Sequence, residues 1–417
     1  MKLKPILLFI TFLLLSEWAM ALTLGQALEK AKQHAIVRNI ELDVELGRQD
    51  YLGSLLNWAP SLSIERNWLQ ESGSSSSLSV PNDAFSINAR LNLFNGMGDY
   101  GYSRSQYYQK KAEEARGQQQ WRSVQFTVAE LFFQCVSAQN LLEKANRAVK
   151  IRKDLEDIAY NRYQRGSLAR NEYIKLKIDR NIEENNLRQR EHQLRACKNS
   201  LAYWVGSEEV SSIDDPGLIS KFEAQLGKNY SLESHPDWQV LKNENESTRW
   251  SIWNEGSALL PDLSLSYSLE PAASFQTEEK ILMLTASWEL LNGAGWTEYK
   301  KSRINFLKTQ NQLNEFKMLW TEKNETARSQ LLEQITTYKT NVENSQYAEE
   351  ILKTGLRRFR YGSISSNEVA IDQSRLIDAL RAEWQSWFAL HQSWLELLSA
   401  RGEDVYSYLN SNLSDQK

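Results

Sequence analysis

The sequence contains few of the residue combinations that support catalysis or metal binding. Its two cysteines, Cys135 and Cys197, are 62 residues apart and belong to no zinc or redox motif. Glycine-rich phosphate loops and the nucleophile elbow of hydrolases are absent. The four histidines are too scattered to ligate one metal ion: His34, His192, His235 and His391. The sequence therefore predicts no enzyme, no cofactor and no metal site.

One segment that contains charged and turn-forming residues, by contrast, occurs twice in the sequence. Residues 162–172 have the sequence RYQRGSLARNE, and residues 358–368 have the sequence RFRYGSISSNE. Arg, Gly, Ser, Asn and Glu are identical in register at an offset of 196 residues. Gly166 and Gly362 permit the left-handed backbone of a tight turn. Each segment is therefore predicted to join two helices.

Two further pairs of segments match in the same order, 60–64 with 261–265 and 93–96 with 290–293. A period of this length is too long for a solenoid repeat and indicates a duplicated domain. The expected organisation is a signal peptide (1–21), repeat 1 (22–205), an equatorial connector (206–234), repeat 2 (235–401) and a C-terminal tail (402–417).

Each repeat is predicted to contain a helix, a β-hairpin and a long helical hairpin. Neither long helix contains a proline, and its length of ~100 Å follows from a rise of ~1.5 Å per residue. Apolar residues between Trp121 and Val149 alternate spacings of three and four, which is a coiled-coil seam that needs a neighbouring helix. The expected bounds are helices 39–58 and 236–260, β-hairpins 61–94 and 262–291, and helical hairpins 99–205 and 296–401, with a capping box at 23–26 before them.

The strand segments alternate apolar and polar residues. Leu263, Leu265 and Tyr267, for example, alternate with Ser264 and Ser266. Their length is close to the ~9–11 residues that cross a bilayer when tilted. A soluble hairpin packed on a helix would show the same alternation, so the periodicity alone leaves both interpretations open.

The N-terminus and the composition limit the class of protein. Lys2 and Lys4, an apolar segment over 6–15 and Ala19-Met20-Ala21 form the three regions of a secretory signal peptide. The mean hydropathy of −0.55 argues against a protein with several membrane-spanning helices. The net charge of −4 is too small to indicate a nucleic-acid partner.

Cys135 and Cys197 are equidistant from Gly166 along the chain, so an antiparallel hairpin places them at the same height. They are candidates for a disulfide if their Cα atoms come within ~7 Å. Two free buried thiols are the alternative, which the usual helix spacing of ~8–10 Å favours.

Four strands per chain leave two open sheet edges, which a bilayer does not tolerate. Three chains would supply twelve strands, an even number that can close. At this point the sequence resembles the TolC-like outer-membrane factor family over residues 22–401. The motifs are the LTLxxAL start at 22–28, PxLS after the first helix, LFNG at 93–96, and a Tyr/Phe-x-x-Gly turn followed by an acid.

The resemblance implies a mainly α fold with a small antiparallel β part. Its duplicated helix–β-hairpin–long helix–helix unit would form, as a homotrimer, a 12-stranded outer-membrane β-barrel continuous with a periplasmic α-helical barrel. The implied function is the exit duct of a tripartite efflux or type I secretion system in the outer membrane of a Gram-negative bacterium. The implied partners are outer-membrane lipid, a periplasmic adaptor protein and an inner-membrane pump.

The resemblance also implies roles for the helical tips, which close the tunnel and face the adaptor. The implied periplasmic gate consists of Glu172, Glu368, Arg162, Arg358 and Phe359, and the implied docking tips of Tyr163, Gly166, Ser167, Gly362 and Ser363. Helix capping and the helix dipole alone would also account for several of these residues.

The tips depart from the family pattern in two ways. Phe359 replaces a tyrosine that can bond the facing acid, and Lys175 and Ile371 stand where a second acid is frequent. We therefore expect arginines to hold the closed state, with these candidates: Arg162, Arg170, Arg358 and Arg360.

Two other functions remain open from the sequence. The first is a secreted or periplasmic coiled-coil scaffold or adhesin whose strands form a soluble hairpin. The second is a porin that acts without a pump. The exported cargo is not encoded in any motif of the sequence.

Overall fold

The computed structural model describes residues 21–67, 84–207, 210, 212–227, 230–270 and 279–414. Residues 1–20 of the predicted signal peptide and the predicted β-hairpin tips lie outside these residues. The helices are α2 (Leu24–Ala31), α3 (Ala35–Leu56), α4 (Gly98–Gln164), α5 (Arg170–Val205), α6 (Ile219–Gln225), η2 (Leu232–Ser234), α7 (Pro236–Gly256), η3 (Ser257–Leu259), α8 (Gly293–Arg360), α9 (Ser366–Arg401) and α10 (Val405–Ser414). The strands are β1 (Ser61–Asn67), β2 (Ala84–Asn95), β3 (Asp262–Glu270) and β4 (Glu279–Ser287). Among the described residues, no helix has the length and apolar character needed to span a bilayer.

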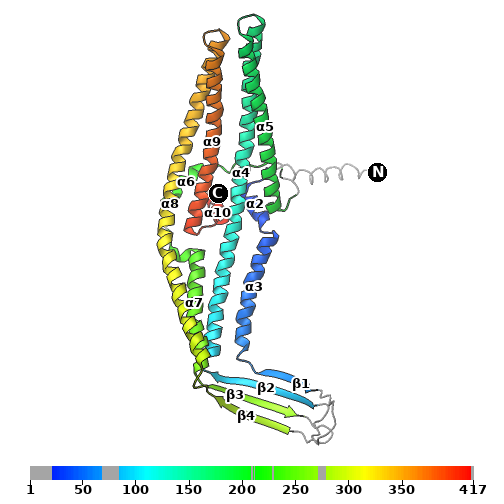
Figure 1. Cartoon of the computed structure of the whole chain (residues 1–417), viewed down its shortest axis with the longest axis vertical. Helices are drawn as coiled ribbons and strands as arrows, with labels where there is room; N and C mark the ends of the chain where they lie inside the picture. Colours follow the sequence, from blue (N-terminus) through cyan, green and yellow to red (C-terminus); the bar gives the residue numbers. More distant parts are fainter. Residues whose placement is uncertain are drawn as a thin grey trace, which may run out of the picture. The chain divides into compact units, whose positions relative to one another are not determined.

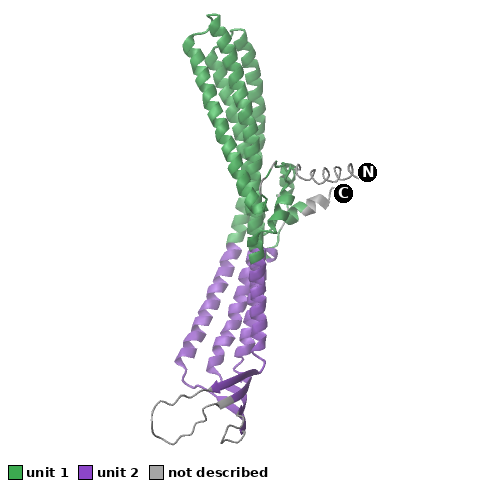
Figure 2. Cartoon of the chain, turned by 90° about the vertical axis from the view of Figure 1, so that its right-hand side faces the viewer, with its two compact units in different colours: residues 1–39, 120–232, 319–417 green, residues 40–119, 233–318 purple. Residues whose placement is uncertain are grey.

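The chain forms two compact units, coloured separately in Figure 2. The first contains residues 1–39, 120–232 and 319–417, and the second contains residues 40–119 and 233–318. Each unit therefore takes residues from both predicted repeats, and α4 and α8 contribute to both units. The repeats seen in the sequence are not the units that pack as compact bodies.

The first unit contains two helical hairpins, α4–α5 and α8–α9 (Figure 1). Helix α4 ends at Gln164 and α8 at Arg360, while α5 spans Arg170–Val205 and α9 spans Ser366–Arg401. All of these boundaries differ by the offset of 196 residues found in the sequence. Left-handed Gly206 and Gly402 end α5 and α9 with equivalent backbone hydrogen bonds.

An apolar core joins the two hairpins near their turns. It contains Leu155, Ala159 and Leu176 from the first hairpin, packed against residues of the second that include Leu352 and Phe359. On α4, this core lies between the predicted seam, which ends at Val149, and the turn.

A second core in this unit is aromatic. Phe133 of α4 makes edge-to-face contacts with Trp387 and Trp394 of α9, and all three side chains are almost fully buried. Phe222 of α6 stacks on Trp394 at 5.2 Å between ring centroids, which anchors the connector to α9. These aromatic contacts supply large apolar areas in helices whose other faces are polar.

The connector and the tail pack on the first unit. Leu22 forms an isolated β-bridge with Ile213 of the connector, and Thr23 begins α2 with the predicted capping box. The tail contains α10, a helix that the sequence analysis did not predict. Its Tyr406 backbone N–H donates to Gln125 Oε1 at 2.9 Å, so the position of this short helix depends on a tertiary contact.

The second unit contains the sheet, whose strands form an antiparallel meander in the order β1-β2-β3-β4. The register pairs Ile64 with Ile87, Ile87 with Leu269, and Tyr267 with Leu282. Side chains of directly paired residues lie on the same face of a sheet. Most apolar residues of β1, β2 and β3 therefore share one face with Leu282, Leu284 and Ala286 of β4. Serines and asparagines of β1, β2 and β3 lie on the other face, together with Ile281 and Met283 of β4.

The apolar face of this sheet is open to its surroundings at both edge strands. Leu62 and Ile64 of β1 are 70% and 64% exposed, and Leu282 and Leu284 of β4 are 70% and 61% exposed. No described element of the chain covers these side chains. A sheet with this composition requires an apolar environment or a partner on that face.

Small residues allow the helices of the second unit to approach closely. A Cβ atom on Gly101 would lie 2.7 Å from the backbone nitrogen of Asn254, so α4 and α7 touch there through glycine. One turn along α4, Ser105 Oγ lies 3.0 Å from Ser247 Oγ of α7. This close packing positions the helix ends that lead into β3 and out of β2.

Several predicted boundaries are wrong at element ends. Helix α7 ends at Gly256 and is followed by η3, although we expected the helix to reach Leu260. Leu260 has extended dihedral angles (φ −109°, ψ 160°), because the residue before Pro261 is disfavoured in the α region. Strand β4 ends at Ser287, earlier than predicted, and α8 begins at Gly293.

Candidate functional site

Both predicted tips are tight turns with the same backbone geometry. Gly166 and Gly362 have φ values of +71° and +76°. Gly166 N–H donates to the Tyr163 carbonyl, and the Ser167 N–H donates to the Arg162 carbonyl, each at 2.9 Å. The second tip has the equivalent pair of bonds, also at 2.9 Å. This is the Schellman arrangement, which satisfies carbonyl groups left unpaired at the helix end.

Arg162 connects the two tips. Its guanidinium lies 4.9 Å from the ring centroid of Phe359 and donates to the Phe359 carbonyl at 3.4 Å. The same guanidinium donates to the Ser167 carbonyl at 3.3 Å. One cation therefore binds a carbonyl of the first turn and a carbonyl in the last turn of α8, where the helix dipole favours positive charge.

Glu172 also connects the tips, although no charged partner is involved. Ser366 Oγ, at the start of α9, donates to the Glu172 carboxylate at 3.0 Å. One turn further along α5, Lys175 Nζ donates to Asn367 Oδ1 at 3.1 Å. The sequence analysis missed the roles of Ser366 and Asn367, since no local pattern shows which residues of α9 face α5.

Glu368, the counterpart of Glu172, has a different environment. Ser365 is the N-cap of α9, and its side chain accepts from the Glu368 N–H at 3.2 Å. In α5 the N-cap is Ala169, which has no capping side chain. The two acids are thus identical in sequence, but one holds the neighbouring hairpin and the other closes its own helix end.

The other predicted gate residues differ in exposure. Phe359 is fully buried in the apolar core between the hairpins, where its ring contributes by packing. Tyr163 is half-buried and stacks on Tyr173 at 5.7 Å. Arg358 is exposed, as is Arg170. Within the described ranges, neither Arg358 nor Arg170 has an ion-pair or hydrogen-bond partner for its side chain, so the expected arginine–acid pairs are not formed in a single chain.

The two cysteines form a disulfide, which corrects the preferred interpretation of free thiols. The Cα atoms of Cys135 and Cys197 are 5.6 Å apart, well below the helix spacing on which that interpretation was based. Both side chains are buried, and the bond joins α4 to α5. The corresponding positions of the second hairpin are Leu331 and Ser393, so only the first hairpin is cross-linked.

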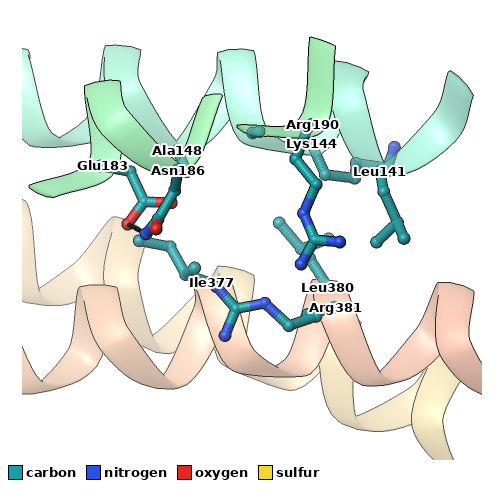
Figure 3. A pocket seen from close by; sticks show the side chains of 10 residues that line it. Leu141, Lys144, Ala148, Glu183, Asn186, Arg190, Ile377, Leu380 and Arg381 are labelled. Carbon is teal, nitrogen blue, oxygen red and sulfur yellow. Dashed lines mark hydrogen bonds between the residues drawn. The ribbon is translucent and has the colours of Figure 1, made fainter. Parts of the chain in front are cut away.

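Further down the hairpins, a cavity of about 30 Å³ lies among α4, α5 and α9. Figure 3 shows Arg190 and Arg381 extending into the space between α5 and α9, with Glu183 beside Asn186. Burial, followed by the nearby Arg381, lowers the pKa of Arg190. This volume accommodates about one water molecule, which is too small for a substrate. The described residues also contain no cluster of His, Cys, Asp and Glu that could hold a metal ion.

The fold is similar to that of several solved outer-membrane proteins. The channel protein CusC superposes with a TM-score of 0.80 at 14% identity, covering 91% of this chain and 92% of that one. VceC from Vibrio cholerae gives a TM-score of 0.77 at 14% identity, with coverages of 91% and 96%. The CmeC outer-membrane channel of Campylobacter jejuni gives 0.78 at 12% identity, with coverages of 94% and 89%.

No family model and no curated protein matches the sequence. The solved structures nevertheless agree over nearly the whole length of both chains, and they are all outer-membrane proteins or channels. The chain therefore has the fold of these outer-membrane channels. The TolC-like resemblance predicted from the sequence is confirmed at the level of the fold.

Proposed function

We propose that the chain is one subunit of an outer-membrane channel that serves as the exit duct of a tripartite efflux or type I secretion system. It lies in the outer membrane of a Gram-negative bacterium, with its helical hairpins in the periplasm. The channel does no chemistry of its own and moves its cargo passively, driven by an inner-membrane pump.

The sheet carries this proposal. Its four strands put most of their apolar residues on one face, and the edge strands β1 and β4 each have an unpaired side. Lipid would cover the apolar face, and the polar face would line a water-filled lumen. A single chain cannot close such a sheet, because open edges are prohibitive in a bilayer.

A homotrimer completes the structure. Three sheets supply twelve strands, and β4 of one chain can pair antiparallel with β1 of the next because strand directions alternate. The duplicated unit, with repeats at 22–205 and 235–401, would then place six helical hairpins around a periplasmic tunnel. This arrangement also supplies the neighbours that the hairpins need on their uncovered sides.

The tips are the proposed gate and adaptor-docking surface. Glu172 and Glu368 would form a ring of six carboxylates in the trimer, a field that favours cations. The turns at Gly166–Ser167 and Gly362–Ser363 are exposed and identical in backbone geometry, which suits an adaptor that engages both tips alike. The proposed gate contains two arginines. Arg358, beside the second turn, is exposed, whereas Arg162 is half-buried.

Antibiotic permeability tests the proposed function. The full chain is expressed in a strain that lacks its own exit duct, together with an adaptor and pump from the same genome, and export of a pump substrate is measured. Expression should restore export and yield a detergent-dependent trimer that dissociates on heating. The Arg358→Glu variant should admit bulky antibiotics, whereas Lys323→Glu, an exposed control on α8 distant from the tip, should not.

A monomer that stays soluble without detergent would contradict the proposal and favour the coiled-coil scaffold or adhesin. Export that persists when the pump is deleted would instead favour a porin that acts alone. Unchanged permeability of Arg358→Glu in a functional trimer would remove the gating role of the tips and leave the duct.

A further inference from the structure

The two helical hairpins correspond residue by residue. Their four helix ends and both turns differ by the same offset of 196, and the turns make the same hydrogen bonds. A contact made by a residue of the first hairpin can therefore be transferred to its counterpart in the second hairpin without any adjustment for insertions.

The boundary between the hairpins of one chain has polar and apolar parts. The polar part contains Arg162, which lies over Phe359, and Glu172, which accepts from Ser366. The apolar part includes Leu155, which is fully buried, and the partly buried Ile151. One face of the first hairpin meets the opposite face of the second in this boundary.

The counterparts on the second hairpin have no such cover. Tyr347 and Ile351, which correspond to Ile151 and Leu155, are 60% and 49% exposed. Arg358 and Glu368, which correspond to Arg162 and Glu172, are exposed, and neither contacts another hairpin within the described chain. The second hairpin thus presents the same kind of face as the first, with nothing bound to it.

The first hairpin presents the matching opposite face. Tyr160 and Ile174 are 46% and 39% exposed, although their counterparts Leu356 and Ala370 are packed in the apolar core. Arg170 is the counterpart of Ser366, so a cation stands where the covered boundary has a hydroxyl group. This exposed face is therefore both apolar and complementary in charge to Glu368.

We infer that the first hairpin of a second copy docks on the second hairpin of this chain and repeats the internal boundary. Arg358 then lies over Tyr163 of the second copy, and Glu368 forms an ion pair with Arg170 of the second copy. The inference rests on the proposed oligomer and specifies which residues meet between its subunits.

The contact between copies differs from the internal one in strength and in salt dependence. The internal hydrogen bond from the neutral Ser366 hydroxyl to the Glu172 carboxylate is replaced by an ion pair, in which Arg170 and Glu368 are both charged. The face and its complement are different surfaces, so the contact is heterologous and closes into a ring when the rotation allows. Salt should weaken the contact between copies more than the contact within a chain.

Cysteine cross-linking in the full-length protein tests the pairing. Two differently tagged chains, Glu368→Cys and Arg170→Cys, are co-expressed and oxidised. Each carries one free thiol, because the native cysteines are already bonded to each other. A covalent dimer carrying both tags is expected on a non-reducing gel. The matched control, Glu172→Cys with Ser366→Cys in one chain, should cross-link internally and keep the mobility of a monomer.

Charge exchange provides an independent measurement. Glu368→Arg should lower the temperature at which the oligomer dissociates in detergent, and adding Arg170→Glu to the same chain should restore it. The pairing would be overturned if the trimer is intact but no covalent dimer forms and the double variant dissociates at the same temperature as Glu368→Arg alone. The proposed function would then still stand. A monomer by light scattering in detergent would overturn both.

Discussion

His391 should make the stability of the first unit depend on pH. Its ring is fully buried in the aromatic core, 3.8 Å from the Trp387 ring and 4.5 Å from the Phe133 ring. Its Nδ1 lies 2.8 Å from the Trp387 carbonyl oxygen, and its Nε2 has no hydrogen-bond partner within the described residues. Burial lowers the pKa of His391 from 6.5 to about 4.

The sign of the effect follows from proton binding. Between pH 6.5 and pH 4 the unfolded chain binds a proton at this position and the folded chain does not. Stability is therefore fully present above pH 6.5 and is lost as the pH falls toward 4. Lowering the pH from 7.5 to 5 should cost about 2 kcal/mol, which is about 30-fold in the equilibrium for opening.

Amide hydrogen exchange in the detergent-solubilised full-length protein measures this opening. After correction for intrinsic exchange rates, protection of α9 around His391 should fall about 30-fold between pH 7.5 and pH 5. The His391→Leu variant should lose most of this pH dependence, since the Trp387 carbonyl keeps its helical N–H donor. The control His192→Leu, at an exposed position on α5, should behave as wild type. Equal losses of protection in wild type and His391→Leu would refute the reasoning.

Three further predictions concern the disulfide, the tips and the sheet. Cys135→Ser combined with Cys197→Ser should cost about 4 kcal/mol by the loop-entropy estimate, measured by urea denaturation; an unchanged midpoint would contradict it. Gly362→Ala should destabilise the turn by about 1 kcal/mol in thermal melts, because φ is +76°, whereas Gly227→Ala, in open space without a positive φ, should not. Leu284→Arg on the apolar face of β4 should cost ~2–4 kcal/mol and reduce the membrane-inserted trimer, and equal loss in the polar-face control Thr285→Arg would count against the proposed lipid face.

Local patterns predicted most of the secondary structure. The turns at Gly166 and Gly362, the capping box at Thr23 and the ends of α5 and α9 all depend on neighbouring residues in the chain. Predictions failed where a neighbouring restriction was overlooked, as at Leu260 before Pro261, or where docking decides, as for α10.

The candidate site was only partly accessible from the sequence. The repeated RxxxGSxxxNE pattern located both turns, but it did not show that Arg162 and Glu172 contact the second hairpin of the same chain. It did not reveal that Phe359 is buried. Identical residues in the two hairpins have different partners because each hairpin packs one face against the other and leaves its opposite face exposed.

The sequence by itself determined the order of the elements, the two turns and the period-two strands, because each follows from local conformation or from hydrophobic spacing. Only the tertiary structure decided which faces meet. It joined Cys135 to Cys197, gave Glu172 and Glu368 different partners, and set the register that puts most apolar residues of the sheet on one face. These features depend on distances between segments far apart in the chain, and no spacing along the sequence records such distances.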